Sequence, residues 1–239
     1  MTEAQVHWEA ALVLARRAAL PRWQGSLLGN LGNLHANLGR MATARELFEQ
    51  ALQAARESGD RKSEGNTQAN LAMLYFVQGS LADAAQAGQA ALRVARDLGH
   101  PRLECVALCN VGLVQGAMGD AAQALANYEA ALQVAQQIGD RRAEGQVLGY
   151  LGLARARLGD SAGAKPLLAQ GHAVLIDAAD ELSLALLLCC RAEAAALAGH
   201  FVEALQAHDE ATALALKAGA GPESELGLAL ARLAQMLNR

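Results

Sequence analysis

The most regular polar feature of the sequence is a set of asparagines that recurs every 40 residues, at Asn30, Asn70 and Asn110. A carboxamide carries both hydrogen-bond donors and an acceptor. Three carboxamides in line could therefore bind the backbone N–H and C=O groups of an extended peptide without reading its sequence. A second interpretation needs no ligand, because asparagines at one phase could be inherited through duplication or could form hydrogen bonds between helices. The sequence leaves both interpretations open.

The thiol and imidazole side chains do not form a pattern typical of metal or catalytic sites. Cys105 and Cys109 are four residues apart, and the adjacent Cys189 and Cys190 lie much further along the chain. A zinc site needs four ligands that converge on the metal. The histidines are His7, His35, His100, His172, His200 and His208, and no two of them have a metal-binding spacing. We therefore expect structural cysteines, structural or surface histidines, no metal, no cofactor and no enzymatic activity.

The glycine-rich stretch GNLGNL at 29–34 is not a phosphate-binding loop. It follows no expected strand, and the chain contains no GxxxxGK[ST] motif. A net charge of −4 gives no electrostatic reason to expect a nucleic-acid partner. No apolar run approaches the roughly 20 residues that cross a bilayer, so no membrane partner is expected. The cysteine usage favours the reducing cytoplasm.

The elements that position these residues are predicted to be helices of nearly uniform length. The chain is 53% apolar, mainly Ala and Leu, with only four prolines, and this composition favours an all-α fold. Small residues recur every 20 residues along the chain: Gly39, Gly59, Gly79, Gly99, Gly119, Gly139, Gly159, Ala179, Gly199 and Gly219. A glycine suits the left-handed position that ends a helix. The aspartates that follow some of these glycines can cap the next helix: Asp60, Asp120, Asp140 and Asp160.

Whole blocks of sequence return with the same 40-residue period. ALQAARESGDRKSEG at 51–65 returns as ALRVARDLGHPRLEC at 91–105 and as ALQVAQQIGDRRAEG at 131–145. A large residue followed by a small one stands before each glycine of the series 39, 79, 119 and 159, as in Leu31-Gly32 and Leu151-Gly152. An alanine follows each turn, at Ala44, Ala84, Ala124, Ala164 and Ala204. This pattern resembles the tetratricopeptide repeat family in its 40-residue variety. It is most similar to the arrays of kinesin light chains, of the adaptor Pins and of bacterial regulatory proteins.

The resemblance implies an all-α, right-handed superhelix of stacked antiparallel hairpins, with about twelve helices. The expected units are a half repeat at 1–20, full repeats at 21–59, 60–99, 100–139, 140–179 and 180–219, and a terminal helix at 220–239. The fourth and fifth units depart from the pattern. Pro166 should kink or delay its helix, Gly171 replaces the usual Ala, and Arg191 stands where a buried Leu is expected.

The first helix of each unit should line the concave side of such an array. A polar stripe runs one residue behind the buried leucines of these helices, so it should face the groove. Its polar members are the expected peptide-binding residues: Asn30, Asn33, Asn37, Asn66, Asn70, Asn110, Gln146, Tyr150 and Arg157. In the similar arrays the asparagine equivalent to Asn30, Asn70 and Asn110 holds the backbone of the ligand peptide, and the resemblance implies that role here. The later stripes, such as Leu186-Cys190-Glu193-Leu197, make the second half of the groove more apolar.

These observations predict a non-enzymatic scaffold that binds a protein or peptide in its concave groove. The alternative is a sensor or regulatory module from a larger bacterial signalling protein with an NTPase, kinase or DNA-binding domain. The two ends of the chain also suggest that the protein could associate with itself. Leu226, Leu230, Leu233 and Leu237 should form an uncovered face on the last helix, which could pair with the unpartnered first helix of another molecule. Such a contact would build head-to-tail chains.

Overall fold

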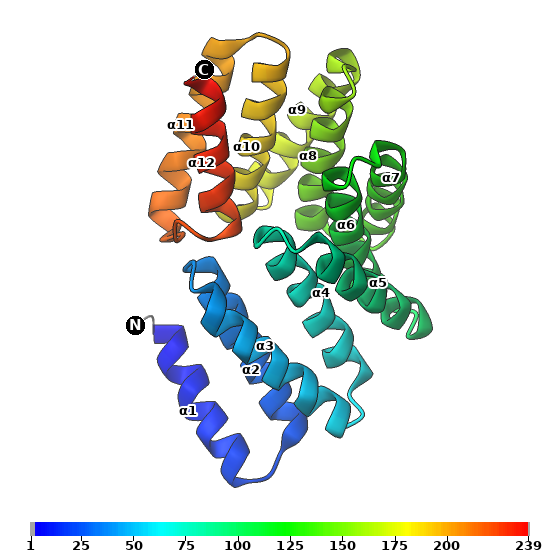
Figure 1. Ribbon diagram of the computed structural model, residues 1–239, viewed down its shortest axis with the longest axis vertical. Coiled ribbons are helices and arrows are strands. Elements are labelled where there is room, and N and C mark those ends of the chain that lie inside the picture. The colour runs from blue at the N-terminus through cyan, green and yellow to red at the C-terminus, as the bar shows by residue number, and fades with distance from the viewer. Residues whose placement is uncertain (1–2, 239) are drawn as a thin grey trace.

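The computed structural model describes residues 3–238, which form an α-solenoid without strands (Figure 1). Its helices are α1 (Glu3–Arg17), α2 (Pro21–Asn37), α3 (Met41–Glu57), α4 (Arg61–Val77), α5 (Leu81–Asp97), α6 (Pro101–Ala117), α7 (Ala121–Gln137), α8 (Arg141–Arg157), α9 (Ser161–Asp177), α10 (Glu181–Leu197), α11 (Phe201–Ala218) and α12 (Glu225–Leu237). The all-α superhelical fold expected from the sequence is confirmed. None of the described helices is long and apolar enough to cross a bilayer.

The turns between the helices follow the predicted chemistry. Every punctuating glycine has a positive φ, and Ala179 adopts the same left-handed conformation at φ +51° without the freedom of glycine. The cap aspartates accept hydrogen bonds from the backbone three residues further on. Asp60, for example, accepts from the N–H of Ser63 at 3.1 Å. Asp120, Asp140 and Asp160 make the equivalent bonds. Each turn therefore ends one helix and starts the next within a few residues.

Small residues allow the two helices of each hairpin to pack closely. The alanines after the turns are nearly inaccessible: Ala44, Ala84, Ala124, Ala164 and Ala204 are at most 2% exposed. Gly32 lies against the ring of Phe48, where an added Cβ would come within 2.5 Å of the ring. Gly29, one turn earlier, would place a Cβ with no atom within 4 Å. The interior glycines of α2 therefore differ in purpose, and only Gly32 is required by packing.

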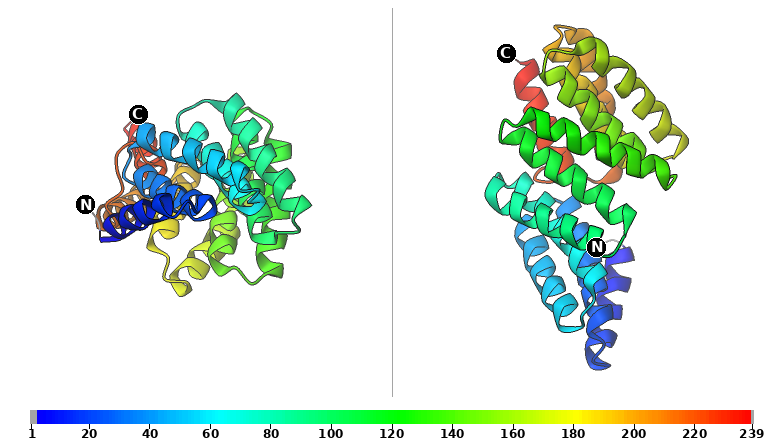
Figure 2. Two further views of the ribbon diagram at one scale, coloured as in Figure 1. Left: turned by 90° about the horizontal axis from the view of Figure 1, so that it is seen from below. Right: turned by 90° about the vertical axis from the view of Figure 1, so that its right-hand side faces the viewer.

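Successive hairpins follow one another along the long axis, from α2–α3 to α10–α11 (Figure 2). Helix α1 packs on α2, and α12 packs on both α10 and α11. Helix α9 begins at Ser161 without delay and continues through Pro166 to Asp177. The delay considered for this helix is therefore absent.

The loop between α11 and α12 returns to the first hairpin and closes the superhelix. The N–H of Gly221 donates to the carbonyl of Asn37 at the end of α2, at 2.9 Å. A Cβ added to Gly39 would lie 3.0 Å from the backbone nitrogen of Glu223. Figure 1 shows the start of α12 beside the turn between α2 and α3. We call this contact the closure contact.

The prediction of an uncovered leucine face on the last helix is wrong. Leu226 and Leu233 are each 3% exposed, and Leu230 packs partly buried in the same cluster with α10 and α11. These leucines pack α12 against α10 and α11 of the same chain. At the other end, Val13 and Leu14 of α1 remain exposed, at 49% and 64%. Only one side of the expected head-to-tail contact is therefore available.

Candidate functional site: the inner hollow

The inner side of the superhelix contains a hollow of about 410 Å³. Its walls come from α6, α7, α8, α10 and α12, with Phe76 of α4 at one edge. Three of the predicted stripes reach it, through Leu113, Ala117, Tyr150, Leu153, Arg157, Leu186, Cys190 and Glu193. The hollow is therefore assembled from the first helices α6, α8 and α10 together with the second helix α7, and α12 closes it on one side.

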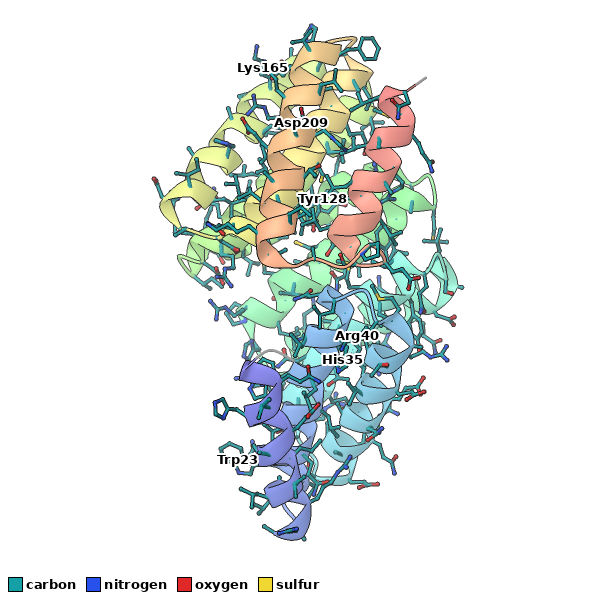
Figure 3. All side chains as sticks on the ribbon, turned by 90° about the vertical axis from the view of Figure 1, so that its left-hand side faces the viewer. Trp23, His35, Arg40, Tyr128, Lys165 and Asp209 are labelled. Atoms are coloured by element: carbon teal, nitrogen blue, oxygen red, sulfur yellow. The ribbon has the colours of Figure 1, made fainter. Side chains whose placement is uncertain are left out.

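Two tyrosines and a carboxyl group lie together in this hollow. The rings of Tyr128 and Tyr150 stack with centroids 5.8 Å apart, and the Tyr150 hydroxyl donates to Oε1 of Glu225 at 3.2 Å. Burial raises the pKa of both tyrosines, so each hydroxyl keeps its proton. Burial also raises the pKa of Glu225, although the Tyr150 hydrogen bond and the charge of Arg232 oppose this shift. Figure 3 shows Tyr128 inside the upper half of the molecule.

The two arginines of the hollow differ in whether they form an ion pair. The Arg157 guanidinium binds the Glu193 carboxylate at 2.6 Å. Arg232 on α12 is exposed, and within residues 3–238 it has no hydrogen bond or ion pair. A guanidinium in this state can bind a carboxylate through two parallel N–H donors. The hollow thus combines apolar walls with one cation available to an incoming acid.

The cysteines near the hollow are unsuited to nucleophilic chemistry. Burial raises the pKa of Cys189 to about 12 and that of Cys190 further. A thiol is a nucleophile only when it is deprotonated. All four cysteines are free, and Cys105 donates a weak hydrogen bond to the carbonyl of Ala131 at 3.5 Å. No cluster of three or more potential metal ligands occurs in the part of the chain that the structure describes.

The predicted asparagine ladder is not one continuous feature. Asn110 is 5% exposed, and its Nδ2 donates to the carbonyl of Ala69 on α4 at 2.7 Å. This is the hydrogen bond between helices that the sequence left open as an alternative. We therefore remove Asn110 from the peptide-binding set, because its amide joins two neighbouring first helices.

The other predicted residues fall into four groups. Asn30, Asn33 and Asn66 are exposed and Asn70 is half-buried, and their side chains make no hydrogen bond within the described residues. Asn37 lines a small cavity of about 80 Å³ beside Ser224 and Glu225. Gln146 donates to the hydroxyl of Ser183 at 2.7 Å, which joins α8 to α10. Of the nine residues, only Tyr150 and Arg157 line the hollow.

Glu225 and Arg232 were missed by sequence reasoning because the period changes before α12. Forty residues after the start of α10 lies Gly221, but α12 begins at Glu225, after the capping residue Ser224. The side chains of Glu225, Ala229 and Arg232 therefore line the hollow. Each lies one residue before a leucine, at 226, 230 and 233, that a strict 40-residue period would have placed on the groove side. The available signal was the local sequence, since Pro222 and Ser224 are typical of a delayed helix start.

Comparison with known proteins supports the same architecture. The tetratricopeptide repeat profile matches residues 23–97 and 103–177. No curated protein matches the chain. Among solved structures, BtubC (BKLC) from P. vanneervenii is 19% identical with a TM-score of 0.67, over 90% of this chain and 91% of that one. At such identities the likeness shows the fold.

Two further structures share the fold at lower coverage of their own length. A Rap protein complexed with Competence and Sporulation Factor is 14% identical with a TM-score of 0.70, over 98% of this chain and 68% of that one. A STAND signal transduction ATPase with a tetratricopeptide repeat sensor, from Pyrococcus horikoshii, is 15% identical with a TM-score of 0.58. The match covers 97% of this chain and 39% of the ATPase. The repeat profile covers most of the sequence, and the helices stack as its hairpins do: the chain belongs to the tetratricopeptide repeat family.

Proposed function

We propose that this chain is a non-enzymatic scaffold that binds a segment of another protein in the inner hollow. The observation that carries the proposal is the hollow itself, about 410 Å³ in volume, with apolar walls and the unpaired Arg232. Ligand pockets in proteins range from about 300 to 1,000 Å³ and combine apolar walls with a few polar groups. The similar Rap structure was solved with a bound factor, which supports a binding role for this architecture.

The chemistry of the hollow suggests the kind of segment. Leu113, Leu153 and Leu186 offer apolar contacts, and Arg232 offers a cation for a carboxylate. The ligand is therefore a peptide with an apolar anchor next to an acidic side chain or a free C-terminus. The open carboxamides of Asn30 and Asn70 would bind its extended backbone along the earlier units. We place the protein in the cytoplasm, where Cys189 and Cys190 would remain reduced.

A variant that fills the hollow tests this proposal. Ala117 is exposed and lines the hollow, so Ala117→Trp should block it without disturbing the core. Ala126→Trp on α7 is the matched control, because Ala126 is exposed and outside the hollow. Peptides selected from a random displayed library would be synthesised, and their affinities measured by fluorescence anisotropy. Arg232→Gln should separately weaken binding of the acidic peptides.

The expected result is a loss of affinity of about tenfold or more for Ala117→Trp, which corresponds to about 1.4 kcal/mol. The control should bind like the parent protein. Equal binding by Ala117→Trp and the parent would contradict a site in the hollow. If a triple variant of Asn30, Asn33 and Asn70 to Ala loses binding instead, the carboxamides carry the recognition.

The second candidate function is a regulatory module within a larger signalling protein. The similar STAND ATPase favours it, because its repeats are described as a sensor and this chain spans only 39% of its length. The length of the native gene product, measured by mass spectrometry, separates the two candidates. A native product of 239 residues would count against the module.

A further inference from the structure

A second cavity lies between α9, α10 and α11, away from the inner hollow. Its volume is about 310 Å³, and it shares no lining residue with the hollow. Its polar lining consists of Ser161, Lys165, His172, Arg191, His200 and Glu203, and alanines with Leu168 form the rest. Figure 3 places Lys165 near the upper end of the molecule, separate from Tyr128 in the hollow. The two cavities are therefore distinct sites.

This cavity exists where the repeat replaces its apolar residues. The positions equivalent to Arg191 in the other units are Leu31, Leu71, Val111 and Leu151, each at most 4% exposed. His172 likewise replaces the leucine of the preceding units, Leu52, Leu92 and Leu132. Burying a side chain of this kind contributes about 1.5–3 kcal/mol to folding. Arg191 in the fifth unit gives up that stabilisation, His172 in the fourth unit gives up part of it, and both replacements line the same cavity. Departures of this kind are expected at functional sites.

The charges in the cavity favour an anion. Lys165 and Arg191 are cations, His172 and His200 add two imidazoles, and Glu203 is the single carboxylate. Glu203 lies 3.5 Å from Arg191, whose side chain remains 35% exposed. Lys165 has no ion pair within the described residues. This positive group stands out in a chain whose net charge is −4.

We propose that this cavity, the cationic cavity, binds a small organic anion with a compact apolar body. The guanidinium of Arg191 and the ammonium of Lys165 bind the anionic group, which is a carboxylate or a phosphate ester. The alanine walls and Leu168 enclose the apolar part. Glu203 is the internal counter-ion that the ligand displaces from Arg191.

Substitutions taken from the repeat itself provide the test. Arg191→Leu restores the residue type of the other units, so the variant should fold and its thermal stability should be equal or higher. Arg93→Leu is the matched control, since Arg93 is exposed on α5, outside the cationic cavity. Binding of phenyl phosphate, benzoate and the uncharged probe benzyl alcohol would be followed by NMR chemical-shift titration of the full chain.

We expect at least one anion to bind with a dissociation constant of about 1 mM or tighter. Arg191→Leu should weaken it about tenfold or more, while Arg93→Leu leaves it unchanged. Glu203→Gln should tighten binding, because it frees the guanidinium. Binding of benzoate but not of phenyl phosphate would identify a carboxylate site. Binding of phenyl phosphate but not of benzoate would identify a phosphate site.

Three outcomes would overturn the proposal: no binding of either anion, equal binding of benzyl alcohol, or undiminished affinity in Arg191→Leu. His172→Leu serves as a second variant, because it also restores the repeat residue without touching Arg191. Ala117→Trp in the inner hollow should not change anion binding. A failure of the cationic cavity is thus distinguishable from a failure of the proposed peptide site.

Discussion

At the scale of single residues, asparagines at one repeat phase have different environments. Asn110 donates its amide to the Ala69 carbonyl of the preceding first helix, whereas Asn70, which also follows a first helix, makes no such bond within the described residues. Asn30 lies on α2, which no earlier first helix precedes, and it is exposed. The same residue type is therefore structural in the middle of the array and open at its start.

The first prediction concerns the stability of these two positions. Asn110→Ala removes the side-chain hydrogen bond to the Ala69 carbonyl, which keeps its helical donor, and we expect the free energy of unfolding to fall by about 0.5–1.5 kcal/mol. Asn30→Ala is the control, and an exposed change of this kind should alter stability by less than about 0.5 kcal/mol. Urea unfolding followed by circular dichroism measures both. Equal stability of the two variants would contradict a structural role for Asn110.

Sequence reasoning was reliable for residues whose role is set by local backbone geometry. The turn glycines and the cap aspartates were predicted correctly, because a left-handed turn and a free helix N-terminus act within a few residues. The partners of Asn110, Gln146 and Arg157 were not predictable in the same way. Each of them bonds to a residue on another helix, and such contacts depend on how tightly the array is coiled.

At the scale of elements, α12 is the helix that departs from the repeat. Its late start turns the leucines towards α10 and α11 and turns Glu225 and Arg232 towards the hollow. Glu225 then accepts a hydrogen bond from Tyr150 of α8. The 40-residue period predicted the existence of α12 but not its phase, since the phase depends on where Ser224 starts the helix.

The second prediction is a pH dependence of stability at the contact between α8 and α12. Burial raises the pKa of Glu225 in the folded protein above its ordinary value of 4.5. The folded chain therefore keeps this proton over a pH range in which the unfolded chain has released it. The stability from this group is fully present below the ordinary pKa and is lost as pH rises through the folded pKa.

Glu225→Gln removes the ionisation but keeps an acceptor for Tyr150. We expect the variant to be more stable than the parent at neutral pH, and the difference should shrink as pH falls below about 4.5. Glu223→Gln, an exposed change two residues earlier, is the control. Thermal melts across pH report the result. A stability difference that grows towards low pH would contradict the assigned shift.

At the scale of the whole molecule, the closure contact joins the last loop to the first hairpin. A Cβ on Gly221 would lie 2.1 Å from the carbonyl oxygen of Leu38, and backbone atoms cannot move aside as a flexible side chain can. This contact links residues at opposite ends of the chain. Sequence periodicity does not encode it, because it depends on the accumulated curvature of every intervening unit.

The third prediction is that Gly221→Ala opens the superhelix. We expect a larger radius of gyration by small-angle X-ray scattering and a lower melting temperature, because the closure contact cannot form. Gly29→Ala is the matched control: its Cβ meets no atom within 4 Å, and it should gain about 1 kcal/mol from better helix propensity. An unchanged radius of gyration in Gly221→Ala would show that the ends do not depend on this contact.

The closure contact also bears on how the gene could have changed. Solenoids generally gain or lose modules easily, since each unit touches only its neighbours. Here one duplicated or deleted forty-residue module would move Gly221 away from Asn37 and separate the two ends. A gain or loss of one module should therefore destabilise this fold, whereas exposed side chains within the modules can change without disturbing the contact between the ends.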